Sequence, residues 1–299
     1  MHLNQKYRLY SILLIAPSVL AILVFVYGFI AFTGVASFIN WTKMKIDFTF
    51  VGFNNYIRLF QTERFLIDLR NTLTFTVLFL LITIVIGLLL AILVDQNIKG
   101  ESLFRNIFLF PMAFSFIVTG VVWRWLLAPG NEITGALGVN LIFEKIGLGF
   151  LANGWYTDPR IGIRAVVIAA VWQYAGYIMA LYLAGIRGIP VEIVEAARVD
   201  GASEINVYRH IILPLVRPIT LSAVIILGHI SLKIFDLVVS MTGPGTGFST
   251  DVPAFFMYDT TFRGNRFAEG SAIAIILLLL VAILVVPYLI NSSKVEVER

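Results

Sequence analysis

The sequence predicts an all-α, polytopic membrane protein with six transmembrane helices. Of its 299 residues, 59% are hydrophobic and only 13% are charged, whereas charged residues make up about 25% of a soluble domain. Six stretches also reach the length of about 20 mostly apolar residues that a helix needs to cross a bilayer. The predicted spans are residues 10–32, 72–94, 106–128, 161–185, 217–240 and 270–291. We treat residues 1–299 as a single transmembrane domain, because no soluble boundary interrupts them.

The titratable residues and the motifs exclude several other classes of protein. The net charge of +4 comes from scattered basic residues, so we expect no nucleic-acid surface. The absence of cysteine excludes disulfides and thiolate metal sites, and His2, His210 and His229 are too far apart to indicate a metal site. No phosphate-loop or hydrolase motif occurs, so we expect this chain not to be an enzyme and to have no catalytic residues, no metal and no cofactor of its own.

The first three spans each carry one further local signal. The apolar core of the first span is too long for a signal peptide, so we expect it to be retained. Residues 57–69 have apolar side chains at helical spacing, which predicts a helix at the membrane interface before the second span. Pro111 predicts a bend near the start of the third span.

The basic residues favour an orientation in which both termini lie in the cytoplasm. The predicted inner and outer segments contain equal numbers of Lys and Arg, but the inner segments are much shorter. The density of basic residues is therefore higher inside, as the positive-inside rule requires.

The fourth span presents small and polar side chains on one face. Gly176, Ala180 and Ala184 lie on that face, and small residues usually mark close packing between membrane helices. Gln173 and Tyr177 share the face, where they either hydrogen-bond a polar solute or contribute to the same packing.

A polar segment, residues 190–214, interrupts the apolar spans but retains a helical composition. Pro190 suits the first turn of a helix, because its missing N–H needs no partner there. Glu195 lies near the positive N-terminus, where negative charge is favoured. Gly201 weakens a helix by about 1 kcal/mol relative to Ala, so we expect two short helices that meet there at an angle. Pro214 ends the second helix.

The fifth span carries the largest set of polar groups at membrane depth. In one continuous helix, five of its polar residues fall within about 60° of one another. They are Ser222, His229, Lys233, Asp236 and Ser240. Charged groups cost about 2.5–3.5 kcal/mol at the centre of a bilayer, so we expect them to face a cavity or a partner. They either line a hydrophilic path or form an internal ion pair and helix–helix hydrogen bonds.

Several motifs together resemble one family of transport proteins. Glu195-Ala196-Ala197 is followed at a fixed spacing by Gly201 and by the closing Ile211-Ile212-Leu213-Pro214. This signature resembles the E-A-A loop of the membrane subunits of ATP-binding-cassette (ABC) importers. Further motifs resemble the carbohydrate permeases of the maltose and glycerol-3-phosphate type, and specifically the first, maltose-F-like permease of such pairs. They are Gly52-x-x-Asn55-Tyr56, Phe110-Pro111, Trp123-x-Trp125-Leu126, Trp172 and Phe235-Asp236-Leu237 with Thr242-Gly243.

The resemblance implies a fold and a role for the polar segment. The fold would be that of a type I ABC importer permease, and the segment 190–214 would contain a cytoplasmic coupling helix that docks on a separate ATPase subunit. The coupling residues would be Glu195, Ala196, Ala197, Asp200, Gly201 and Ala202. We refer to residues 190–214 as the coupling loop.

The resemblance also implies a substrate and an assembly. The expected function is ATP-driven import of a sugar or oligosaccharide along a path through the spans. The expected path residues are Gln173, Tyr177, His229, Lys233 and Asp236. An ABC permease for another polar solute, or an ion-coupled secondary transporter that uses Lys233 and Asp236, is the alternative.

The implied partners are a second permease subunit, two ATPase subunits that bind ATP and Mg, and an extracytoplasmic solute-binding protein. The implied location is the cytoplasmic (inner) membrane of a bacterium or an archaeon, where the chain crosses the lipid bilayer several times.

Overall fold

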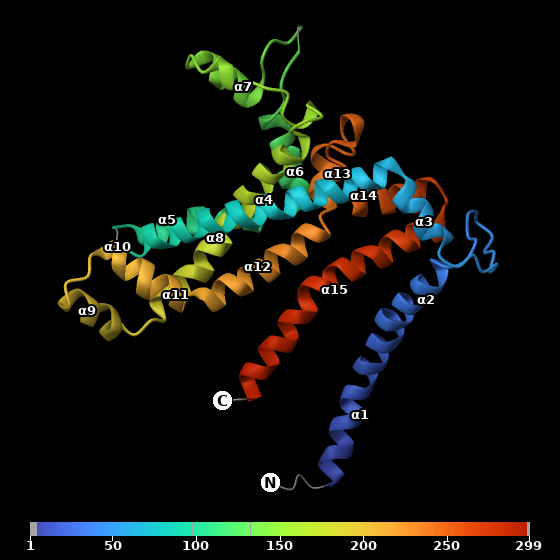
Figure 1. Ribbon diagram of the computed structural model, residues 1–299, viewed down its shortest axis with the longest axis horizontal. Helices are drawn as coiled ribbons and strands as arrows, with labels where there is room; N and C mark the ends of the chain where they lie inside the picture. The colour runs from blue at the N-terminus through green and yellow to red at the C-terminus, as the bar shows by residue number, and fades with distance from the viewer. Residues whose placement is uncertain (1–4, 97–98, 132, 298–299) are drawn as a thin grey trace. The chain divides into compact units, whose positions relative to one another are not determined.

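A computed structural model describes residues 5–96, 99–131 and 133–297, and the chain divides into two compact units. One unit comprises Met1–Thr62 with Phe256–Leu278, and the other comprises Glu63–Phe255 with Leu279–Arg299. Within the described ranges all regular structure is helical apart from two isolated β-bridges, which confirms the all-α prediction (Figure 1). His2 lies outside these ranges.

The described helices match the predicted number of spans only if bent pairs are counted. Four helices are long and apolar enough to cross a membrane, and the number is six if each of two bent helix pairs forms one span. The four are Tyr10–Ala36, Glu63–Val94, Gly162–Arg187 and Phe267–Pro287. The single domain and the limits of the spans stay predictions.

The first unit begins with one long apolar helix. α1 (Gln5–Ile22), the π-helical turn η1 (Leu23–Gly28) and α2 (Phe29–Ala36) follow one another without a break. In the most apolar part of this helix no side chain is buried by the rest of the chain. Its apolar surroundings must therefore come from lipid or from another subunit.

Asn55 fixes the segment that follows α2. Its side-chain amide donates hydrogen bonds to the backbone oxygens of Ser37 and Ile39, at 2.9 and 3.1 Å. Gly52 has a φ of 58° and turns the chain just before α3 (Asn54–Gln61), a conformation that favours glycine. These contacts give the Gly-x-x-Asn-Tyr motif a structural role in this unit.

The helix predicted over residues 57–69 is wrong as a single element. Thr62 adopts an extended conformation and ends α3. The following residues already belong to α4 (Glu63–Val94), so the second apolar helix begins nine residues before the predicted start at residue 72.

The core of the second unit lies between α4 and α8 (Gly162–Arg187), which pack along their lengths. α4 buries one face, at intervals of three and four residues, as an amphipathic helix does. About two-thirds of the most apolar part of α8 is buried, so α8 is the central helix. Gly87 permits the close approach, because a Cβ there would lie 2.6 Å from the side chain of Ile178.

The third predicted span, residues 106–128, is broken rather than bent. α5 (Glu101–Leu109) with the 3₁₀ turn η2 (Phe110–Ala113) meets α6 (Phe116–Leu126) at 100°. Phe114 is extended, and Ser115 caps α6 by accepting a hydrogen bond from the N–H of Val118 at 3.3 Å. The break therefore lies just after Pro111, and the capping serine contributes to it as well as the proline.

The fifth predicted span is also divided, and the continuous helix over residues 217–240 is wrong. α12 (Arg217–Leu232) ends before Lys233, and α13 (Asp236–Met241) begins three residues later. Ile234 is buried between them and Phe235 packs against Phe255 with ring centroids 6.3 Å apart. Tertiary packing of these two side chains therefore overrides the helical propensity of the segment.

The remaining elements are the short helices and turns that connect these helices, together with α15, which contains the apolar stretch Phe267–Pro287. In the coupling loop they are α9 (Val191–Val199), α10 (Glu204–Val207), the π-helical turn η5 (Tyr208–Ile212) and α11 (Leu213–Leu215). Elsewhere they are α7 (Gly138–Lys145), η3 (Gly149–Leu151), η4 (Trp155–Thr157), η6 (Thr246–Phe248), α14 (Pro253–Tyr258), η7 (Asp259–Arg263) and α15 (Phe267–Val297).

Candidate functional site

The coupling loop contains two short helices that are joined at Gly201, as the sequence predicts. Gly201 has a φ of 83°, and its N–H donates to the backbone oxygen of Arg198 at 3.0 Å. The N–H of Ala202 donates to the oxygen of Ala197, also at 3.0 Å. This pair of bonds is the Schellman motif, which ends α9 and requires the left-handed conformation that glycine adopts most easily. Gly201 therefore sets the direction in which the chain leaves α9.

The predicted coupling residues lie on an open surface. No side chain of α9 is buried, and Glu195, Ala196 and Asp200 are exposed. Two large apolar side chains flank the joint, because Val199 is 87% exposed and Ile205 is 78% exposed. Exposed apolar residues beside small ones are typical of a surface that another protein covers.

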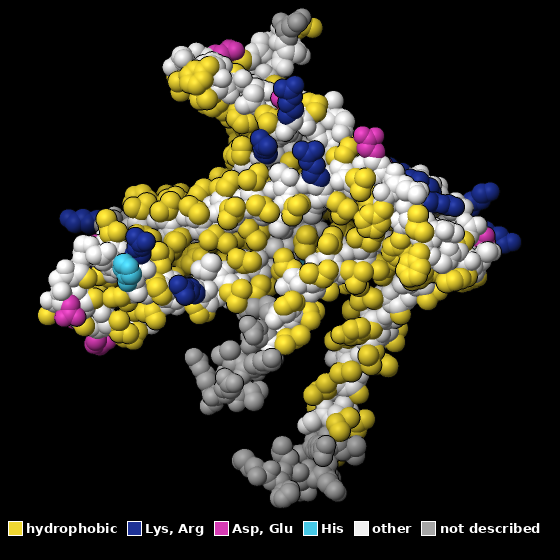
Figure 2. Space-filling model, in the orientation of Figure 1, with side chains coloured by type: hydrophobic (Ala, Val, Ile, Leu, Met, Phe, Trp, Pro, Cys, Tyr) yellow, Lys and Arg dark blue, Asp and Glu magenta, His cyan; other side chains and the backbone are white. Residues whose placement is uncertain are grey.

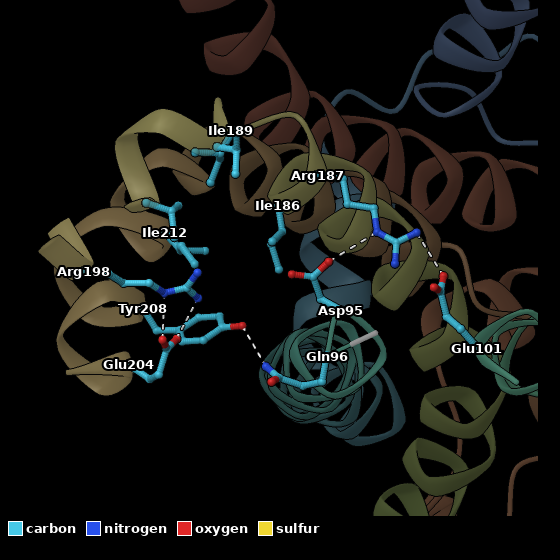
Figure 3. Close-up of a pocket in the computed structure, with 12 residues that line it drawn as sticks. Asp95, Gln96, Glu101, Ile186, Arg187, Ile189, Arg198, Glu204, Tyr208 and Ile212 are labelled. Carbon is cyan, nitrogen blue, oxygen red and sulfur yellow. Dashed lines mark hydrogen bonds and ion pairs between the residues drawn. The ribbon is translucent and has the colours of Figure 1, made fainter. Parts of the chain in front are cut away.

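A cavity of about 840 Å³ lies between the coupling loop and the ends of α4 and α8. Figure 3 shows that Arg187, at the end of α8, points between two carboxylates. Its Nε lies 3.3 Å from Asp95 Oδ1 and its Nη1 lies 2.9 Å from Glu101 Oε1. One guanidinium therefore ties the ends of α4 and α8 to the start of α5.

Two further contacts shape the opposite wall of this cavity (Figure 3). Arg198 forms two bonds with Glu204, Nε to Oε1 at 2.8 Å and Nη2 to Oε2 at 3.1 Å. Hydrogen bonding to this carboxylate raises the pKa of Arg198. Gln96 donates to the hydroxyl of Tyr208 at 3.1 Å. Since exposed ion pairs contribute little stability, these contacts chiefly hold α9, α10 and the end of α4 in a fixed arrangement.

Gln173 is buried beside the break in the third span. Its Nε2 donates to the backbone oxygen of Phe114 at 2.8 Å. That carbonyl lies between η2 and α6, where the regular helical ladder is interrupted. Gln173 therefore has a structural partner, and its contact with a solute stays a prediction. Tyr177 is half-buried and its ring lies edge-on to Tyr174, with centroids 6.5 Å apart.

We expect Gln173→Leu to lower the free energy of unfolding by about 1–3 kcal/mol, because the Phe114 carbonyl loses its donor. Thermal unfolding of the purified protein in mild detergent measures this change. Gln61→Leu is the matched control, because Gln61 is exposed at the end of α3. An unchanged melting temperature together with a weaker affinity for transported solute would instead make solute binding the main role of Gln173.

The polar stripe predicted on the fifth span is divided between two helices. His229 is half-buried in the last turn of α12, Lys233 is exposed at its C-cap, and Asp236 is exposed at the start of α13. One continuous stripe is wrong, because residues at this spacing share a face only in an unbroken helix. Within the described ranges no ion pair joins Lys233 to Asp236. Their place in a solute path stays a prediction.

The sequence analysis does not predict the charged network at the cavity, which consists of Arg187, Asp95 and Glu101. Asp95 and Arg187 are 92 positions apart, and Glu101 begins a different helix. Each of the three residues is a single charge at the end of an apolar stretch. Such isolated charges do not indicate, from the sequence, that the residues form ion pairs with one another. Only the packing of α4 against α8 brings them together.

Comparisons with known proteins identify relatives along most of the chain. Residues 83–292 match the model of the family "Binding-protein-dependent transport system inner membrane component". A probable ABC transporter permease protein of Pyrococcus horikoshii is 42% identical over 287 residues, which cover 96% of this chain and 97% of that protein. The xylose/arabinose import permease protein XacH of Haloferax volcanii is 34% identical, over 90% of this chain and 83% of its own length.

The fold is similar to that of a solved transporter. The crystal structure of a bacterial alginate ABC transporter, in complex with an alginate pentasaccharide-bound periplasmic protein, contains a chain that matches with a TM-score of 0.76. The two chains are 26% identical, and the match covers 94% of this chain and 93% of the other.

Proposed function

Because the chain belongs to the family of binding-protein-dependent transport system inner membrane components, we propose that it forms part of the translocation path of an ABC importer for a sugar or oligosaccharide. The chain is a membrane permease subunit with the type I ABC importer fold. The sugar import permease of H. volcanii and the alginate transporter support carbohydrate as the cargo. Family membership argues against the ion-coupled secondary transporter.

The observation that carries the coupling role is the open surface at Gly201. The exposed residues around the joint between α9 and α10 would dock on a separate ATPase subunit, with Val199 and Ile205 covered in the complex. ATP and Mg would be bound by that subunit, because this sequence contains no phosphate-loop motif. The set Glu195, Ala196, Ala197, Asp200, Gly201 and Ala202 would form the contact.

The charged network offers a route by which movement of the loop reaches the spans. When ATP closes the ATPase subunits, the coupling loop would be displaced as a unit, since Arg198 and Glu204 hold its two helices together. The contact between Gln96 and Tyr208 and the pairs of Arg187 would transmit that displacement to the ends of α4, α5 and α8. The spans would then alternate between inward and outward access.

The complete machine would contain further subunits. A second permease would cover part of the exposed apolar surface, two ATPase subunits would lie in the cytoplasm, and an extracytoplasmic binding protein would deliver the sugar. The alginate transporter complex with its periplasmic protein supports the last of these. In the cytoplasmic membrane, both termini would then lie on the same side as the coupling loop.

Co-purification tests this proposal. The tagged chain is extracted in several mild detergents, its companions are identified by mass spectrometry, and the intact complex is titrated with labelled sugars, amino acids and phosphate esters. We expect an ATPase with a phosphate loop, a second permease and stimulation of ATP hydrolysis by a sugar-loaded binding protein. A solitary chain in every detergent would refute coupling, and stimulation only by a non-sugar solute would refute carbohydrate as the cargo.

A further inference from the structure

A second polar pocket lies at the other end of the helix pair that forms the core. It has a volume of about 390 Å³ and lies between the start of α4, the start of α8 and the loop around η6. Three arginines line it, Arg70, Arg160 and Arg164, and no carboxylate does. Figure 2 shows several Lys and Arg side chains on the surface between α7 and α4.

The three guanidinium groups are not engaged by a carboxylate in the described structure. In the part of the chain that the structure describes, none of them takes part in an ion pair. The carboxylate of Asp158 lies nearby, but it accepts from the backbone N–H of Arg160 at 2.8 Å. Arg164 is the third residue of α8, where the helix dipole disfavours a cation. Within the described ranges the three arginines are therefore not paired with a carboxylate, although Asp158 contributes one negative charge close to Arg160.

Neutral groups in the same pocket add to its capacity to bind an anion. Ser249 is 7% exposed, and its Oγ has no hydrogen-bond partner within the described structure. This hydroxyl faces Gly162, because a Cβ built on that glycine would lie 2.8 Å from it. A buried hydroxyl without a partner costs free energy, so it points to a ligand that supplies one.

The depth of the pocket in the membrane follows from the length of α4. Arg70 and the end of α4 at Val94 are separated by about 36 Å along the helix, at 1.5 Å per residue. The hydrocarbon core of a bilayer is about 30 Å thick. The arginine pocket therefore lies at the membrane interface opposite to the one at which the coupling loop lies.

The faces next to the arginines are apolar. Leu73 and Val77 are exposed on the face of α4 that carries Arg70, and Ile168 and Trp172 are exposed on the face of α8 that carries Arg164. These residues follow the arginines by three to eight positions and so extend from the interface toward the middle of the membrane. If the phosphate of a lipid occupied the pocket, the acyl chains of that lipid would lie along α4 and α8.

We propose that the pocket of Arg70, Arg160 and Arg164 binds the headgroup phosphate of an anionic phospholipid in the leaflet opposite to the coupling loop. Arginine suits this ligand, because its planar group binds phosphate oxygens in pairs. The hydroxyl of Ser249 donates to another phosphate oxygen, and the acyl chains cover the apolar faces of α4 and α8. The site is separate from the predicted solute path and does not depend on the identity of the cargo.

The test measures lipid binding to the full-length chain, purified with its companion subunits and depleted of lipid in mild detergent. Native mass spectrometry records the binding of added dioleoylphosphatidylglycerol and of dioleoylglycerol, which lacks phosphate. We expect the triple variant Arg70→Gln/Arg160→Gln/Arg164→Gln to bind the phospholipid at least about tenfold more weakly than the unmodified protein, since each basic residue contributes to phosphate binding. Arg124→Gln is the control, because Arg124 lies at the end of α6 and does not line the pocket.

Several results would overturn the proposal. Equal phospholipid affinity in the triple variant would remove the pocket as the site, and equal binding of dioleoylglycerol would remove the role of the phosphate. Displacement of the lipid by millimolar inorganic phosphate would identify free phosphate as the ligand. Loss of the binding protein from the triple variant, with unchanged lipid affinity, would identify carboxylates of that protein. If the triple variant fails to fold, the single variants at Arg70 and Arg164 are expected to show a few-fold loss each, and no loss would refute the site.

Discussion

Gly201→Val is expected to abolish most transport while the chain still inserts into the membrane. The φ of 83° lies in the left-handed region, which costs a side-chain-bearing residue about 1–2 kcal/mol and costs a β-branched one most. α9 would then lose its Schellman ending, and the surface of Val199 and Ile205 would turn away from its partner. Because 1.4 kcal/mol corresponds to a tenfold change in affinity, we expect about five- to thirtyfold less ATPase subunit to co-purify.

Gly147→Val separates the coupling role from backbone strain in general. Gly147 also has a positive φ, 78°, and like Gly201 it has no atom within 4 Å of a built Cβ, but it follows α7 rather than the coupling loop. We expect this variant to retain transport. Gly201→Asn should restore part of the activity, because Asn tolerates the left-handed region. Equal transport in Gly201→Val and the unmodified protein would refute the coupling role of the joint.

Gly176→Val is expected to destabilise the second unit by about 3 kcal/mol, the upper part of the range for overpacked cores. A Cβ at this position would overlap the backbone oxygen of Phe108. A backbone carbonyl cannot rotate away as a side chain does, so α5, which contains Phe108, must move away from α8. Thermal unfolding in detergent and the yield of inserted protein measure the effect.

Gly34→Val is the matched control for that variant. Gly34 is also a helical glycine, in α2, and a Cβ built on it meets no atom within 4 Å. The same substitution is therefore expected to change the melting temperature little. If both variants unfold at the temperature of the unmodified protein, the close packing of α5 on α8 at Gly176 does not contribute to stability.

Local sequence signals predicted the coupling loop well and the fifth span poorly. The sequence predicts the joint at Gly201 because its signals are local. They are the glycine itself, the helical composition of the residues that follow it, and the prolines that close the loop. The division of the fifth span depends on Ile234 and Phe235, which are apolar in an apolar helix and carry no local signal of a break. Their conformation is decided by contacts such as that of Phe235 with Phe255.

The sequence by itself determined the membrane class, the all-α architecture, the family resemblance and the joint at Gly201. These features depend on composition, on the length of apolar stretches and on residues close together in the chain. The tertiary structure alone decided the contact of Gln173 with the broken third span, the network of Arg187 with Asp95 and Glu101, and the pocket of Arg70, Arg160 and Arg164. The network and the pocket depend on groups that are distant in sequence and that meet because α4 and α8 pack along their lengths, with one set of charges at each end.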